Sequence, residues 1–130
     1  MHKVLFILMF SLSLTACKKD NDKEPDVPAV ITIASPITGT IFLNGTALQI
    51  RGNATDNNVL ASVQCTVRNT TTNSTLYSRT INTGNVGFFD FGQDWTITGI
   101  TGPTPARLII TTTDKVGYTA TKEVDIQLTD

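Results

Sequence analysis

From Leu48 to Ala54 the sequence reads LQIRGNA, which alternates apolar or small side chains with polar ones. A period of two is typical of a β-strand that has one buried and one solvated face. We expect the buried face to carry Leu48, Ile50, Gly52 and Ala54, and the solvated face to carry Gln49, Arg51 and Asn53.

The same period continues on both sides of this stretch, from Ala29 to the C-terminus. No segment there has apolar residues at helical spacing, and threonine, which favours strands, is frequent. The sequence predicts an all-β domain, an antiparallel β-sandwich of seven to eight strands with almost no helix. The expected strands are Val30–Ile33, Leu48–Ala54, Ala61–Arg68, Thr75–Ile81, Phe88–Phe91, Trp95–Ile100, Ala106–Thr113 and Thr119–Leu128, with a loop over Asn82–Gly87.

Turn sequences between these strands resemble those of the bacterial immunoglobulin-like domains found in cell-surface proteins. The turns that carry the likeness are Ser35-Pro36-Ile37-Thr38-Gly39, Gly52-Asn53-Ala54-Thr55-Asp56 and Thr113-Asp114-Lys115-Val116-Gly117. The likeness covers residues 30–128 and departs from the group at Tyr118 and in the aromatic segment 88–95. It implies an immunoglobulin-like β-sandwich over residues 30–130.

The first 17 residues, MHKVLFILMFSLSLTAC, place one lysine before a short apolar run. The run is shorter than the about 20 apolar residues that span a bilayer, so residues 1–16 are interpreted as a cleaved signal peptide. Its end, Leu-Thr-Ala-Cys, resembles the lipobox of bacterial lipoproteins, which implies cleavage before Cys17 and lipidation of that cysteine. The alternative is an ordinary secretory signal that happens to precede a cysteine.

Residues 17–29 follow as the lipidated cysteine and a charged segment with two prolines. Such a segment buries too little apolar surface to fold, so it is expected to act as a flexible tether. Its order of lysines followed by acidic residues resembles the export signal of Bacteroidota lipoproteins, which implies an outer-membrane, cell-surface location. A generic solvated linker is the alternative.

Composition argues against several functions. The 130 residues carry 16% charged residues and a formal net charge of −1, so nucleic acid is not an expected partner. His2 is the single histidine and is removed with the signal peptide, which excludes histidine-dependent triads and imidazole zinc sites. We therefore expect a non-enzymatic protein. Cys65 would have no disulfide partner and is expected to be a small buried side chain, the alternative being a reactive thiol.

Two acidic loop residues are candidate metal ligands. In an immunoglobulin-like topology the loops that carry Asp56 and Asp114 lie at the same end, so their carboxylates would converge. Oxygen ligands of this kind suit Ca²⁺, the one cofactor the sequence suggests. The alternative is that both side chains accept hydrogen bonds from their own turns.

A second candidate site is the aromatic segment over residues 87–95, GFFDFGQDW. If its rings faced outward they would form a stacking platform for a sugar, edged by hydrogen-bonding groups. The candidate ligand-binding residues are Phe88, Asp90, Gln93, Asp94 and Trp95. The alternatives are that the rings pack in the core, or that Asp90 and Asp94 act as the paired carboxylates of a glycosidase.

Together these features predict a surface lipoprotein that acts as a binding or adhesion module for a glycan or an envelope protein. A purely structural spacer, or an accessory subunit of a surface complex, is the alternative.

Overall fold

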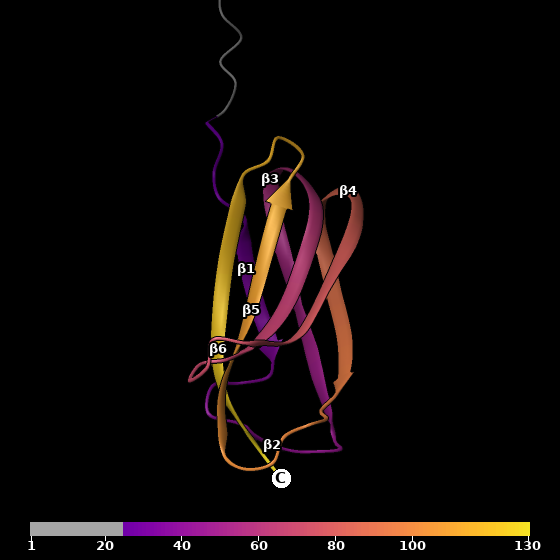
Figure 1. Ribbon diagram of the computed structural model, residues 1–130. Coiled ribbons are helices and arrows are strands. Elements are labelled where there is room, and N and C mark those ends of the chain that lie inside the picture. The colour runs from indigo at the N-terminus through magenta and orange to yellow at the C-terminus, as the bar shows by residue number, and fades with distance from the viewer. Residues whose placement is uncertain (1–24) are drawn as a thin grey trace, which may run out of the picture.

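The computed structural model describes residues 25–130, and within them the chain is all-β with no helix (Figure 1). Its six strands are β1 (Val30–Ser35), β2 (Ile41–Leu43), β3 (Ala47–Asn69), β4 (Thr75–Thr96), β5 (Thr104–Asp114) and β6 (Thr119–Thr129). The expected signal peptide, Cys17 and most of the expected tether lie outside the described residues. Nowhere in residues 25–130 is there a helix long and apolar enough to span a membrane.

β3 and β4 are much longer than the other strands because each runs through two groups of paired strands. In the first group the beginning of β3 lies between β1 and the end of β4, so Gly52 pairs with Ile33 on one side and with Phe91 on the other. In the second group the end of β3 lies between the beginning of β4 and β5, and β6 and β2 follow. All pairs are antiparallel except β2 with β6.

Both long strands bend where they pass from one group to the other. The pairing of β3 with β4 shifts register between Thr55 and Leu60, as at a β-bulge. β4 turns through Gly84 and Asn85, whose φ angles are 75° and 61°. The hydroxyl of Thr83 donates to the carbonyl oxygen of Leu60 at 2.5 Å, which joins the two bends inside the protein.

One hydrophobic core receives side chains from both groups of strands. As the alternation predicts, Leu48, Ile50 and Ala54 are fully buried, whereas Gln49 is exposed. The first group also contributes Ile31 and Phe91, and the second group contributes Leu60, Val63, Cys65, Val67, Leu108, Ile110, Val124, Ile126 and Leu128.

Several expected boundaries are wrong, and the count of seven to eight strands is not confirmed. The two strands expected over residues 48–54 and 61–68 are one strand, β3, and the loop expected over Asn82–Gly87 belongs to β4. Bulges and left-handed residues bend these strands without ending their pairing. The strand expected over residues 95–100 ends at Thr96, and β2 was not expected at all.

The domain has two poles. The proximal pole is where residues 25–29 join β1, and it also carries the bends of β3 and β4 and the β5–β6 turn at residues 115–118 (Figure 1). The distal pole carries residues 36–40, the β3–β4 turn at residues 70–74, residues 97–103 and the C-terminus.

Candidate functional site

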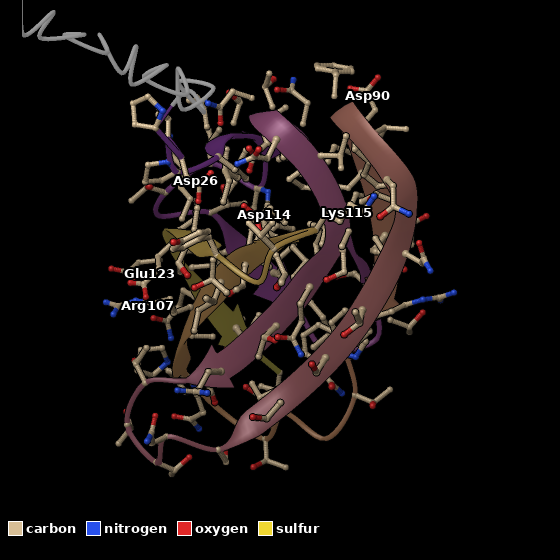
Figure 2. All side chains as sticks on the ribbon, turned by 90° about the horizontal axis from the view of Figure 1, so that it is seen from above. Asp26, Asp90, Arg107, Asp114, Lys115 and Glu123 are labelled. Atoms are coloured by element: carbon tan, nitrogen blue, oxygen red, sulfur yellow. The ribbon has the colours of Figure 1, made fainter. Side chains whose placement is uncertain are left out.

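Three carboxylates meet at the proximal pole. The structure brings Asp56, in the bend of β3, close to Asp114, the last residue of β5. Asp26, in the segment before β1, joins them, and one carboxylate oxygen from each residue lies within 4.8 Å of the other two. Figure 2 shows Asp26 and Asp114 near each other at this pole, whereas Asp90 lies apart on β4.

Asp114 is the most buried of the three, with 4% of the residue exposed. Its Oδ1 accepts the backbone N–H groups of Val116 at 2.9 Å and Tyr118 at 2.8 Å, which closes the β5–β6 turn. Oδ1 therefore accepts hydrogen bonds from its own turn, which is the alternative to a role as a metal ligand. Its other oxygen, Oδ2, is buried and has no hydrogen-bond partner within residues 25–130.

Asp56 and Asp26 are linked through the neighbouring asparagines. Asp56 Oδ1 accepts the backbone N–H of Asn58 at 2.8 Å, and the side-chain amide of Asn58 donates to Asp26 Oδ1. The side-chain amide of Asn57 donates to the carbonyl oxygen of Pro25 at 3.3 Å. The segment before β1 is thus hydrogen-bonded to the bend of β3.

No lysine or arginine of the described chain forms an ion pair with these three carboxylates. The ion pairs of residues 25–130 are Arg51–Asp94, Arg107–Glu123 and Arg107–Asp125, all elsewhere on the domain. The cluster therefore has the negative charge and the oxygen ligands that suit a hard cation.

The aromatic segment does not form one platform, because alternate residues of β4 point to opposite faces. Phe91 is in the core at 3% exposed, opposite Gly52 in the pairing. Phe88 is on the other face and is 54% exposed, and Asp90 and Asp94 share that face by their spacing. Of the candidate ligand-binding residues, Gln93 and Trp95 are therefore separated from Phe88, Asp90 and Asp94.

Trp95 packs between the two parts of β4. Its ring stacks on Tyr77 with the ring centroids 5.5 Å apart and the planes at 20°, and it contacts the core cluster. The hydroxyl of Tyr77 donates to Gln93 Oε1 at 3.5 Å. Desolvation raises the pKa of Tyr77, and the Arg79 charge partly opposes that effect. These three side chains thus connect the beginning of β4 with its end.

Asp90 and Asp94 lie on one face of β4 but do not line one hollow. Four residues of extended strand place their Cα atoms roughly 13 Å apart, so the two side chains would have to lean toward each other to reach the about 5–9.5 Å between the carboxylates of a glycosidase. Asp94 instead pairs with Arg51 at 2.6 Å. The hollow beside it, about 410 Å³, is lined by Arg51, Arg79, Gly92, Gln93 and Asp94 and does not include Asp90.

A groove of about 510 Å³, which no sequence motif predicts, lies toward the distal pole. Ile41 lines it and is 65% exposed. Leu43 (54%) and Ile37 (71%), which are close to Ile41 in sequence but do not line the groove, are also exposed. The groove is lined by Thr38, Gly39, Ile41, Thr70, Pro105, Ala106, Arg107, Asp125, Ile126 and Gln127. A signal existed in the apolar run at residues 41–43, which lies outside the expected strands.

One wall of this groove is charged. Arg107 Nε donates to Asp125 at 2.6 Å, and Arg107 Nη1 lies 3.2 Å from Glu123. These charged side chains are exposed at the surface of β5 and β6. The hydrogen bond from Arg107 lowers the pKa of Asp125 below its ordinary value. The groove therefore offers an exposed isoleucine next to a surface ion pair.

Cys65 lies in the core, fully buried between Val63 and Val67 on the inner face of β3. Burial raises the pKa of its thiol to about 11. The thiolate, which is the nucleophilic form, is therefore disfavoured at neutral pH. The structure supports the interpretation of Cys65 as a small buried side chain.

Comparison with known proteins identifies the fold but no family. The sequence matches no protein-family model and no curated protein. Its structure is similar to the fibronectin(III)-like modules of CbhA from Clostridium thermocellum, with a TM-score of 0.51 and 12% sequence identity over 79% of this chain. This chain spans about 46% of the length of that structure. The fold is therefore similar to that of a fibronectin III-like module, which is immunoglobulin-like.

Proposed function

We propose that this chain is a lipoprotein of the bacterial outer membrane, anchored through Cys17, whose β-sandwich domain binds an envelope protein at the cell surface and catalyses no reaction. The two groups of strands would form the facing layers of the sandwich, since both contribute to one core.

Residues 14–17 support the anchor, because Leu-Thr-Ala-Cys follows a basic start and a short apolar run. Each buried CH₂ of an acyl chain contributes about 0.8 kcal/mol, so two or three chains would hold the domain firmly on the membrane. The charged segment up to Pro28 would then separate the domain from the lipid surface.

The arrangement of the poles is the observation that carries the proposal. Residues 25–29 join the domain at the proximal pole, so an anchor upstream would leave the distal pole facing away from the membrane (Figure 1). Exposed aliphatic side chains and a groove of about 510 Å³ lie toward that distal pole. The proximal pole also exposes apolar side chains, among them Val116 and Tyr118. The groove beside Ile41, rather than exposure alone, therefore supports the distal surface as a contact surface.

The chemistry of this surface favours a protein over a glycan. A sugar ring needs flat aromatic faces with hydrogen-bonding groups beside them. Trp95 stacks on Tyr77 against the core, while Phe88 lies on the other face of β4. The distal groove offers aliphatic side chains and an ion pair instead, which suits a protein surface.

A spacer role is the second candidate, and the packing of Trp95 favours it, because the most aromatic segment mainly supports the fold. In that case the distal pole would have no partner of its own.

Anchoring is tested with Cys17→Ser in the native cells. The wild-type chain is expected in the membrane fraction, and the variant in the soluble fraction, because the variant cannot form the thioether. Protease added to intact cells should remove the wild-type domain if it faces outward. A variant that remains with the membrane would contradict the anchor.

Binding is tested by placing a photo-crosslinking residue at Ile41 in the native cells, with Thr121, exposed on β6 near the proximal pole, as the matched control. A binding module is expected to give a discrete protein adduct from position 41 and none from position 121. Equal adducts from both positions, or none from either, would favour the spacer.

A further inference from the structure

The acidic cluster at the proximal pole contains a buried oxygen that the fold leaves without a partner. Asp114 is only 4% exposed, and its Oδ1 already accepts two backbone N–H groups. Its Oδ2 is buried and accepts no hydrogen bond from residues 25–130. Buried carboxylate oxygens normally have a partner, so this one points to a ligand that residues 25–130 do not supply.

The spacing of the three carboxylates fits a single ion. Ca²⁺ binds oxygen ligands at about 2.3–2.6 Å, so two oxygens on opposite sides of one ion lie roughly 5 Å apart. One carboxylate oxygen from each of Asp26, Asp56 and Asp114 lies within 4.8 Å of the other two. All three could therefore contact the same ion without moving far.

We propose that Asp26, Asp56 and Asp114 bind one Ca²⁺ ion, and that this ion fixes the segment before β1 to the proximal pole of the domain. Three carboxylates that pair with no lysine or arginine within residues 25–130 supply the charge and the hard oxygen ligands that Ca²⁺ prefers. Mg²⁺ binds more weakly, since it holds its own waters and demands a stricter octahedral geometry.

The origin of the three ligands gives the ion a structural role. Asp56 and Asp114 belong to β3 and β5, whereas Asp26 precedes β1 and reaches the cluster through Pro25 and the neighbouring asparagines. The ion thus cross-links the first described residues of the chain to the domain. The direction in which the domain leaves its N-terminal segment becomes dependent on calcium, whether or not Cys17 carries lipid.

Calorimetric titration of the full-length chain in detergent, after removal of metals with a chelator, tests the binding. We expect one Ca²⁺ per chain with a Kd on the order of 0.1–1 mM. Asp26→Asn and Asp56→Asn should each weaken binding roughly tenfold or more, because each removes one charged ligand. Asn at position 56 keeps an acceptor for the N–H of Asn58, so the bend of β3 is preserved.

Asp90→Asn is the matched control, because Asp90 is an exposed aspartate outside the cluster and should leave the Kd unchanged. Hydrogen exchange at residues 25–30 reads out the cross-link separately. Ca²⁺ should slow this exchange in the wild-type chain and not in Asp26→Asn. No binding at millimolar Ca²⁺, equal or tighter binding of Mg²⁺, an effect of Asp90→Asn equal to that of Asp26→Asn, or exchange that Ca²⁺ leaves unchanged would each overturn the proposal.

Discussion

At Gly52 three strands approach one another closely, because it pairs with Ile33 of β1 and Phe91 of β4. A Cβ built there would lie 2.2 Å from the backbone oxygen of Thr32 and 2.6 Å from the ring of Phe91. The first of these neighbours is backbone and cannot turn aside, so a larger side chain would separate β1 from β3 or displace the Phe91 ring.

Gly52→Ala is therefore expected to destabilise the domain by roughly 1–3 kcal/mol, the usual range for overpacking a core. Urea unfolding measures the change. Gly92→Ala, one strand away, is the control, because its Cβ would meet no atom closer than 3.5 Å. Equal stability of the two variants would contradict the close approach at Gly52.

Cys65 should be unreactive while the domain is folded. In a Cys17→Ser chain it is the only thiol, and with its pKa raised to about 11 by burial it is protonated at pH 8. A thiol reagent should then modify it at the rate of unfolding, and quickly in denaturant. Fast modification of the native domain would contradict the burial.

The same shift gives a pH dependence with a definite sign. The folded state holds the Cys65 proton more tightly than the unfolded state, whose pKa is near the ordinary 9.0. The contribution to stability is therefore complete below about pH 9 and is lost as the pH rises toward about 11. Cys65→Ala, compared over that window, should lack this part of the decline.

Which residues could be predicted from sequence depends on what fixes their position. Asp56 and Asp114 follow from loop order in the expected topology, so their convergence is visible in the sequence. Asp26 lies in a segment without periodicity, and only the path of the chain at the proximal pole brings it there. For Trp95 the sequence leaves both a surface role and core packing open, because alternation gives its face of β4 but not its neighbour Tyr77.

The bend of the strand β4 depends on residues whose sequence is typical of a loop. Gly84 has a φ of 75° and no atom within 4 Å of a Cβ, so an alanine there would be strained by the backbone alone. We expect Gly84→Ala to lower the free energy of unfolding by about 1–2 kcal/mol. Gly102→Ala has equal space and no left-handed φ, so it should change stability by less than about 0.5 kcal/mol.

Comparison of these two variants tests whether residues 82–87 are a bend within a strand or a flexible loop. If β4 were broken at residues 82–87, as the sequence predicts, a flexible loop would absorb the alanine and both variants would behave alike. Thermal unfolding followed by circular dichroism distinguishes them. The alternation of apolar residues predicts the hairpin of β5 and β6 well, because its two strands are regular. The same alternation does not predict the bends of β3 and β4. There the strand continues through bulges and left-handed residues whose sequence is typical of a loop.

At the scale of the whole molecule, the two groups of strands are joined through continuous chain. β3 and β4 belong to both groups, and their buried residues enter one core. Local patterns predict an all-β domain but not this sharing, since pairing between Thr55 and Phe88 or between Leu60 and Asp114 is a long-range property. The poles, and with them the positions of both candidate sites, follow from that pairing.

Because of this sharing, neither group should unfold alone. Trp95 is the only tryptophan and reports on the β4 edge of the first group, whereas far-ultraviolet circular dichroism reports on all strands. In a chain that begins at residue 18, both signals should follow one transition in urea, with a slope of about 1–3 kcal/mol per molar. Fluorescence that changes at lower urea than the dichroism would mean that the end of β4 detaches first. The shared core would then hold the end of β4 less firmly than the continuity of β3 and β4 through both groups implies.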